Sequence, residues 1–540
     1  MGAVPIRRSG PGITGVADRG GVGRGVGGAR SRVAFVLVTT VLCALTLGLG
    51  YANKARCVGP EFDSLGRSGP DYTVRVARDV CYSDIQQLWI GRDIDRHVFP
   101  YLSGGYNPTT EQLYGGAVEY PVLTGMAIYL AAAPSTNDGQ FLLWSAVLLA
   151  VAGLLSAALL AWLAGLRSWW FALAPPLVLY AFHNWDLFAV CATVVAFWAL
   201  LRGSRPLASE PTAIERPAPE RSAPRPPATR TAAGLSGHIG RPGPLVVAAL
   251  ALGVGAAFKL YPMMFALPVA LWLGTGGWRP AAGSAHPARA RWLTAAAFGA
   301  GTAGVFLLIN LPFMVLGWTG WWASFQFQWS RPIDLTTNTI WFWGARPYSD
   351  SANLGVQHDL AMAATITTLS ALLLVCALGF LRLRRDKVYP WLPVCAAMVC
   401  GYLLFNKVHS PQFALWLLPF FVLLGIRAGW ILAYFVADAA IGIGFFRWQY
   451  LIGSGMPSGS YDALSPQLVL IGVWGRAALL IALTVVFVHA GVVEVPTRQV
   501  NGSRPGRSEA NPGERPETVT PAASPTAAMQ TTARAETTRG

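Results

Sequence analysis

The chain has 540 residues, of which 53% are hydrophobic and 12% are charged, and its mean hydropathy is positive. This balance excludes an ordinary soluble globular protein and indicates a helical protein that crosses a membrane several times. The formal net charge is +15. The arginines gather in the N-terminal arm and in loops between apolar runs, which is typical of cytoplasmic loops and argues against a nucleic-acid-binding face.

The N-terminal part of the chain consists of a basic arm, an apolar run and a long polar loop. Residues 1–32 are rich in Gly and Arg, have no apolar periodicity, and are predicted to be a disordered cytoplasmic arm. The run 33–51 is longer than the core of a usual signal peptide and is followed by no A-x-A cleavage site, so we expect a retained anchor. The polar loop 52–121 separates this anchor from the next apolar segment.

The rest of the chain is dominated by apolar runs of membrane-crossing length. They lie at about 140–164, 169–182, 184–201, 244–274, 292–316, 359–382, 389–405, 411–426, 428–446 and 466–489. The run 244–274 has Lys259 and Pro262 near its midpoint, so we expect two short crossings with a turn between them. The positive-inside rule then gives about twelve crossings, with both termini in the cytoplasm.

This topology predicts an all-α, polytopic fold in two transmembrane modules. The N-terminal module is 33–201, with 52–121 as an outer loop, and the C-terminal module is 243–490. The linker 202–242 and the tail 491–540 are rich in Pro, Ala, Thr and Arg, and we expect both to be disordered and cytoplasmic. The same topology places every polar motif of interest on the outer face.

The seven cysteines include no CxxC pair, so none has the spacing of a metal site. Cys57 and Cys81 flank the polar loop and can form a disulfide if that loop lies outside the cytoplasm. The spacing leaves this pairing open. The other cysteines lie in apolar runs and are expected to be buried: Cys43, Cys191, Cys376, Cys395 and Cys400.

Two carboxylates of the polar loop are candidates for chemistry. Asp84 precedes Ile85 and an apolar stretch that predicts an amphipathic helix on the outer membrane surface. Partial removal of water there would raise the pKa of the carboxyl and make it a better base, although Ser83 and Asp84 also suit a helix N-cap. Glu119 is a candidate substrate or metal contact, or simply an acid at a helix N-terminus, because Pro121 suits a first helical turn.

Several polar groups later in the chain are candidates for substrate binding. The turn His183-Asn184-Trp185-Asp186 joins two apolar runs, where ionisable residues are functional candidates and a plain turn is the alternative. Lipid phosphates need cations near the membrane interface. For Lys259, the alternative is that its side chain only snorkels to the interface. The candidate cations are Lys259, Arg331, Arg346, Lys407 and His409.

Together these residues resemble the actinobacterial family 87 glycosyltransferases, members of the multi-spanning GT-C superfamily that use polyprenyl-phosphate mannose. The resemblance rests on short segments spread over roughly 80–490. These segments are Tyr82-Ser-Asp84, Pro100-Tyr101, Glu119-Tyr120-Pro121, Asn184-Trp-Asp186, Lys259-Leu-Tyr-Pro262 and Ser410-Pro-Gln412-Phe-Ala-Leu-Trp416.

The resemblance implies a catalytic outer face, a polyprenyl-phosphate sugar donor, and an inverting transfer to a cell-envelope glycolipid or glycan such as a lipoglycan. It implies Asp84 as general base, with Asp93, Asp95 and Glu119 as competitors. No cofactor is expected, and a divalent metal stays open. The implied substrate-binding residues are Glu119, Tyr120, His183, Asp186, Lys259, Arg331, Lys407, His409 and Gln412.

Two other classes of function fit the same composition. A lipid or sugar flippase, or a secondary transporter, would use Asp84 and Lys259 along a translocation route. A non-catalytic scaffold of envelope assembly is a further alternative. The polar groups gather on one face in the expected topology, which favours the transferase.

Overall fold

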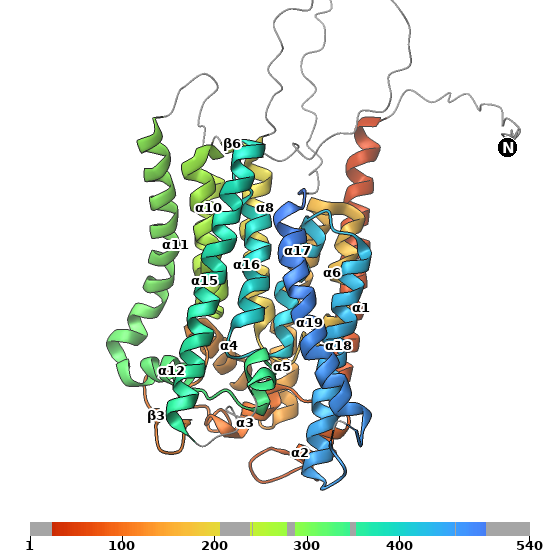
Figure 1. The fold of residues 1–540 in the computed structure, drawn as a ribbon. Coiled ribbons are helices and arrows are strands. Elements are labelled where there is room, and N and C mark those ends of the chain that lie inside the picture. The colour runs from red at the N-terminus through yellow and green to blue at the C-terminus, as the bar shows by residue number, and fades with distance from the viewer. Residues whose placement is uncertain are drawn as a thin grey trace, which may run out of the picture. The chain divides into compact units, whose positions relative to one another are not determined.

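The computed structural model describes residues 24–205, 238–239, 241–277, 287–345, 353–459 and 461–492, and they are overwhelmingly helical (Figure 1). They belong to one compact unit. The tail from residue 493, most of the linker 202–242, Arg346, and residues 1–23 of the predicted arm lie outside the described residues. The first helix begins inside that arm, at Arg24.

Among the described residues, seven helices are long and apolar enough to cross a membrane. They are α1 (Arg24–Ala55), α5 (Asp138–Ala164), α8 (Asp186–Gly203), α11 (Ala288–Leu316), α15 (Leu354–Asp386), α18 (Ala428–Gly453) and α19 (Leu464–His489). Shorter apolar helices complete the bundle: α4 (Val122–Ala132), α9 (Gly243–Phe258), α16 (Trp391–Phe405), and the pair η5 (Pro411–Trp416) and α17 (Leu418–Leu423).

Short helices and hairpins fill the connections. The short helices are α2 (Tyr72–Arg78), α3 (Asp84–Gly91), η1 (Gly165–Ser168), α6 (Trp169–Ala172), α7 (Pro175–Tyr180), η2 (Tyr261–Phe265), α10 (Ala266–Trp272), η3 (Leu273–Gly277), α12 (Trp318–Ser330), η4 (Leu335–Thr337) and α13 (Ile340–Gly344). The antiparallel strand pairs are β1 (Glu61–Phe62) with β2 (Ser68–Gly69), β3 (Gly105–Asn107) with β4 (Gln112–Tyr114), and β5 (Ser204–Arg205) with β6 (His238–Ile239).

Two of the apolar runs are broken by proline. In the run 244–274 the first helix ends at Phe258, as expected, and the chain continues as η2, which has Pro262 in its first turn, and α10. The run 169–182 is not one helix as expected from its composition. It forms α6 and α7, because Pro175 and Pro176 cannot donate the hydrogen bonds that would join α6 to α7.

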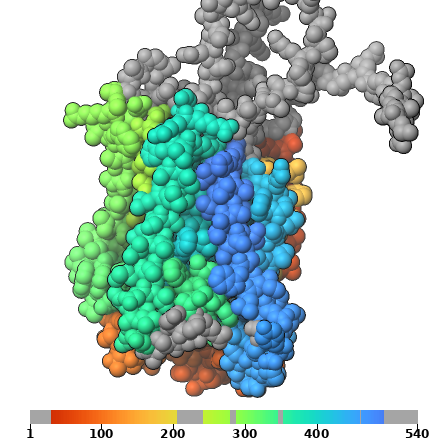
Figure 2. All heavy atoms as spheres, in the orientation of Figure 1, coloured from red at the N-terminus to blue at the C-terminus, as the bar shows by residue number. Residues whose placement is uncertain are grey.

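The long helices present apolar side chains on the outside of the bundle. On α11 and α15, which form the left and centre of the face drawn in Figure 2, Leu308 is 70% exposed, Val315 72% and Leu373 64%. Such surfaces would be costly in water and suit the hydrocarbon core of a membrane. The chain is therefore a multi-pass helical membrane protein.

The two ends of the bundle differ in character. The polar end, where α2, α3, β3 and α12 lie, carries the loop 52–121 and the aromatic segment around α12 (Figure 1). At the opposite, basic end Arg167 donates to the Leu424 carbonyl (2.8 Å) and Arg382 donates to the Val488 carbonyl (2.6 Å). The separation of polar motifs from basic loops, expected from the sequence, is thus present in the fold.

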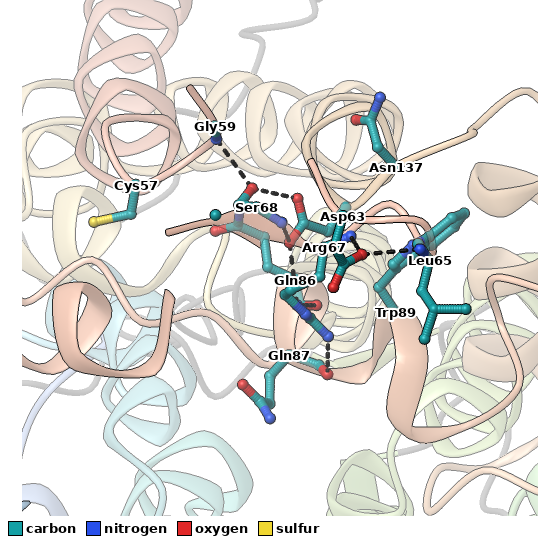
Figure 3. Close-up of polar contacts among 12 residues, drawn as sticks. Cys57, Gly59, Asp63, Leu65, Arg67, Ser68, Gln86, Gln87, Trp89 and Asn137 are labelled. Carbon is teal, nitrogen blue, oxygen red and sulfur yellow. Dashed lines mark hydrogen bonds and ion pairs between the residues drawn. The ribbon is translucent and has the colours of Figure 1, made fainter. Parts of the chain in front are cut away.

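A disulfide between Cys57 and Cys81 closes part of the polar loop. Polar contacts around Arg67 and Ser68 fasten the loop to the bundle (Figure 3). The Asp138 carboxylate, at the start of α5, accepts from the Ser68 hydroxyl (2.5 Å) and from Arg67 Nη1 (3.1 Å). Arg67 also donates to the carbonyls of Gln86 and Gln87 in α3. These bonds hold α3 against the N-terminal end of α5. The five remaining cysteines are buried and free, as expected.

Candidate active site

The first residue of α3, Asp84, is held by the turn 180–185. Its backbone N–H donates to the His183 carbonyl (2.8 Å), and the Ser83 hydroxyl donates to the Phe182 carbonyl (2.7 Å). Ser83 is the N-cap residue of α3, yet neither its side chain nor that of Asp84 caps the helix. The N-cap alternative for Asp84 is therefore wrong, and its carboxylate is free for other contacts.

The Asp84 carboxylate is aimed at the turn between α7 and α8. Asn184 Nδ2 donates to Asp84 Oδ2 (2.7 Å) and to the Tyr120 hydroxyl (2.8 Å). His183 Nε2 lies 3.9 Å from the same carboxylate oxygen, and 24% of the Asp84 side chain stays exposed. The turn 180–185, with Asn184 held by Tyr120, thus orients one carboxylate that solvent or a substrate can still reach.

The surroundings change the proton affinity of this group. Burial raises the pKa of Asp84 above its ordinary value, while the hydrogen bond from Asn184 and the positive charges of Lys259 and Arg331 act in the opposite direction. Burial also lowers the pKa of His183 well below its ordinary value. His183 is therefore neutral at pH 7, and Asp84 is not half of an ion pair with it.

Lys259 acts on Asp84 through its positive charge, and its ammonium group lies among aromatic rings. Its ammonium donates to Asp186 Oδ2 (2.6 Å), and Trp416 Nε1 donates to the other Asp186 oxygen (2.7 Å). The ammonium lies 5.1 Å from the ring centre of Phe413 and 6.0 Å from that of Tyr120. Simple snorkelling does not describe Lys259, because its side chain is directed to a buried carboxylate.

Glu119 is compensated by an arginine. Its carboxylate accepts from Arg92 Nε (2.8 Å), and its backbone carbonyl accepts from Gln328 Nε2 (3.0 Å). Pro121 is the N-cap residue of α4, next to the position expected. Glu119 thus joins the loop to α12 and contributes little free negative charge to the site.

Two cations lie close together on different segments, Arg331 directly after α12 and Lys407 shortly after α16. Lys407 donates to the carbonyls of Trp329 (2.7 Å) and Arg331 (3.0 Å). Burial, with help from the positive charge of Arg331, lowers the pKa of Lys407 to about 8. Arg331 itself donates to the Thr336 hydroxyl (3.4 Å), which leaves most of its guanidinium donors for other partners.

His409 and Gln412 occupy a different, buried location. Both are 1% exposed, and neither ring nitrogen of His409 has a hydrogen-bond partner among the described residues. Burial and the positive charge of Arg476 lower the pKa of His409 well below its ordinary value. His409 thus feels the charge of Arg476, a buried residue of α19, and the Gln412 side-chain oxygen is buried without a hydrogen-bond partner among the described residues.

The other carboxylates of the loop have structural surroundings. Asp93 accepts from the Gly115 backbone N–H (2.8 Å) and lies 3.5 Å from Arg96. Asp95 Oδ1 is buried without a hydrogen-bond partner among the described residues. Among the described residues, Asp93 is engaged by Gly115 and Arg96, and Asp95 has a buried oxygen, whereas Asp84 is partly exposed and oriented by Asn184, so the geometry favours Asp84.

Two residues near Asp84 were missed by the sequence analysis. Lys54, at the end of α1, is 2% exposed and donates to the Tyr82 carbonyl (2.7 Å). Arg92 neutralises Glu119. Lys54 could have been found, because it lies one turn from the end of an apolar run, where an ionisable residue is a functional candidate. Among the described residues, no group of three His, Cys, Asp or Glu side chains is placed to hold a metal ion.

Comparison with known proteins adds one family match. Residues 239–448, less than half of the chain, match the family described as "Mannosyltransferase (PIG-M)". The matched region contains Lys259, Arg331, Lys407 and His409 but not Asp84. No curated protein matches the chain.

Among solved structures, the chain is similar to ArnT from Cupriavidus metallidurans bound to undecaprenyl phosphate. The similarity has a TM-score of 0.35 and 13% sequence identity, and it covers 86% of this chain and 78% of that one. The fold and site thus define a multi-pass membrane protein with an ionisable site at its polar end. Its region 239–448 is similar to the mannosyltransferase family named above.

Proposed function

We propose that this protein is an integral membrane glycosyltransferase that moves a mannosyl residue from a polyprenyl-phosphate sugar to a hydroxyl of a cell-envelope glycolipid or glycan. The observation that carries the proposal is the Asp84 carboxylate, which is partly exposed, oriented by Asn184, and subject to the positive charges of Lys259 and Arg331. The mannosyltransferase family match to residues 239–448 supports the donor class. Membership of family 87 stays part of this proposal.

In the proposed reaction, Asp84 is the general base. It takes the proton of the acceptor hydroxyl while that oxygen attacks the anomeric carbon of the donor. The bond between that carbon and the phosphate oxygen breaks, and polyprenyl phosphate leaves with the bonding electrons. One displacement of this kind inverts the anomeric configuration. Burial raises the pKa of Asp84 above its ordinary value, which strengthens its carboxylate as a base.

The departing phosphate needs positive charge that no carboxylate has already neutralised. Lys259 is paired with Asp186, so its net contribution is small. Arg331 and Lys407 have only neutral hydrogen-bond partners among the described residues. We therefore assign the phosphate to Arg331 with support from Lys407, and assign Lys259 to positioning Asp186 and the aromatic wall.

The proposal places the site on the outer face of the membrane, with both termini in the cytoplasm. The Cys57–Cys81 disulfide supports this placement, because disulfides persist in oxidising compartments. The basic loops at the opposite end of the bundle support it as well, by the positive-inside rule. A donor that arrives within the bilayer then needs no nucleotide-binding domain.

The decisive experiment is a transfer assay of purified protein with labelled polyprenyl-phosphate mannose and a panel of acceptors. We expect Asp84→Asn to reduce transfer by about a hundredfold or more. The matched control Asp93→Asn, in the same loop, should keep activity near that of the wild type. Full activity of Asp84→Asn would overturn the assignment of the base, and no transfer to any acceptor would overturn the function.

A flippase or transporter is the second candidate, and one observation favours it. Asp438 and Arg476 are charged residues buried inside α18 and α19, where a translocation route would need them. Reconstituted vesicles with labelled lipid in one leaflet separate the two functions. A transporter would move the lipid without forming a glycosidic bond, whereas the transferase would form product in detergent solution.

A further inference from the structure

A basic pocket lies beside the proposed active site, where the ends of α1, α2 and α18 meet. This arginine pocket has a volume of about 450 Å³ and is lined by Arg56, Arg78, Asp79, Val80, Ile443 and Arg447. None of these residues has a role in the proposed chemistry. The pocket belongs to the same end of the bundle as Asp84, since Val80 precedes Asp84 by one short segment.

The pocket carries more positive than negative charge. Asp79, the one carboxylate in its lining, is engaged by Arg78 through two hydrogen bonds of 2.9 and 3.0 Å. Arg56 and Arg447 donate instead to neutral backbone carbonyls, those of Asp79 and Arg78. These bonds fasten the end of α2, but a guanidinium has five N–H donors, so both groups retain donors and an uncompensated charge.

The helix surfaces that lead from the membrane region to the pocket are apolar and suit contact with lipid. On α18, Val436 is 70% exposed and Ile443 40%, and Arg447 follows on the same helix face one turn later. On α1, Leu45 and Leu49 are each 63% exposed on the face that leads to Arg56. The exposed apolar residues of α18 and of α1 therefore form two stripes along the membrane region. The stripe on α18 ends at Arg447, and the stripe on α1 ends at Arg56.

This combination matches an amphiphile with an anionic head. Paired guanidinium groups recognise phosphate through two-pronged hydrogen bonds, and the apolar stripes suit acyl chains. The pocket also adjoins the Asp84 site. Phe446, next to Arg447, stacks on Tyr82 with ring centres 5.2 Å apart and lies 6.0 Å from the His183 ring.

We propose that the arginine pocket binds the phosphate of an anionic lipid acceptor and so presents the sugar hydroxyl of that lipid to Asp84. The acceptor role rests on the proposed function, whereas binding of the lipid phosphate does not. The pocket thereby selects glycolipids built on a phosphate-containing anchor over neutral glycans.

Binding is tested without turnover, on the full chain in detergent. Thermal stabilisation is measured with phosphatidylglycerol, phosphatidylcholine and inorganic phosphate. We expect phosphatidylglycerol to stabilise the protein and the other two to do so at least about tenfold less potently. Arg56→Gln/Arg447→Gln should weaken the phosphatidylglycerol effect at least about tenfold, and Arg447→Lys should weaken it less. Arg96→Gln, an exposed arginine of the same loop outside the pocket, is the control.

The acceptor role is tested by kinetics with an acidic glycolipid acceptor. The double variant should raise KM for that acceptor at least about tenfold and leave KM for the donor unchanged. Equal binding of phosphatidylglycerol and phosphatidylcholine, or equal binding of inorganic phosphate, would overturn the lipid-phosphate site even if transfer proceeds. Loss of lipid binding with an unchanged acceptor KM would overturn the acceptor role. Lipid binding by an inactive wild-type protein would instead overturn the proposed function.

Discussion

Asp84 and Lys407 set opposite limits on the pH at which the proposed site has the right charges. Asp84 must be ionised to act as a base, and burial raises its pKa, so activity is lost as pH falls through that raised value. Lys407 must be protonated to attract phosphate, and burial lowers its pKa to about 8, so its contribution is lost as pH rises through that value. The two groups together predict a bell-shaped profile.

The fall of activity at high pH tests whether the Lys407 ammonium supplies positive charge for the phosphate. In wild-type protein we expect kcat/KM for the donor to fall above about pH 8, because the ammonium loses its proton. In Lys407→Arg the fall should move to higher pH, since a guanidinium stays charged. The measurement is kcat/KM against pH for both proteins. If both profiles decline at the same pH, Lys407 does not hold the phosphate charge.

At the scale of single elements, α4 is held in place by a close approach at Gly125. A Cβ at this position would overlap the Tyr101 ring. The single Tyr101 O–H proton is shared between the carbonyls of Tyr120 (2.9 Å) and Pro121 (3.0 Å), so it holds the loop residue Tyr101 against the start of α4.

Gly125→Ala should therefore displace Tyr101 and destabilise the protein by about 1–3 kcal/mol. Gly304→Ala in α11 is the matched control, because a Cβ there meets no atom within 4 Å and alanine favours a helix over glycine. Thermal unfolding of the purified proteins in detergent compares them. Equal unfolding temperatures for the two variants would contradict the close packing of Gly125 against Tyr101.

The helices α18 and α19 share a buried charge pair. Asp438 is 0% exposed and Arg476 is 3% exposed, and Arg476 donates to the Asn338 carbonyl (3.1 Å). Both carboxylate oxygens of Asp438 lack hydrogen-bond partners among the described residues. Each buried charge depends on the field of the other, because isolated charges are strongly disfavoured there.

Arg476→Leu alone should destabilise the protein by about 3–5 kcal/mol, because it leaves Asp438 buried without a compensating charge. Adding Asp438→Leu should recover most of that loss. The same detergent unfolding measurement, made on both single variants and the double variant, gives the coupling between the two sites. Additive losses in the double variant would show that the two charges do not compensate each other.

At the scale of the whole molecule, the polar and basic ends predict opposite sides of the membrane. A cysteine at Arg96 of the polar end, where the side chain is 72% exposed, should react with an impermeant maleimide in intact cells. A cysteine at Arg385 of the basic end, 85% exposed, should react only after permeabilisation. The native free cysteines are buried and give a low background. If the cysteine at Arg385 reacts in intact cells and the cysteine at Arg96 reacts only after permeabilisation, the proposed site does not lie on the outer face.

Much of the helical architecture could be predicted from composition, because membrane-crossing helices need long apolar runs and satisfy their own backbone hydrogen bonds. The break after Phe258 was predictable from Lys259 and Pro262. The division of 169–182 was missed, since mean hydropathy does not register the two prolines. The buried partners Asp438 and Arg476 were missed because each is one charge in an otherwise apolar run.

The sequence by itself determined the class of the molecule, its polar loop and the residue types available for chemistry. Only the tertiary structure decided which of these groups meet. It paired Lys259 with Asp186 and Glu119 with Arg92, placed Asn184 on Asp84, and moved His409 away into the bundle. The physical reason is that apolar periodicity determines where a helix lies. The partner of a polar side chain depends on contacts between segments that lie far apart in the chain, from 27 residues for Arg92 and Glu119 to 100 for Asp84 and Asn184.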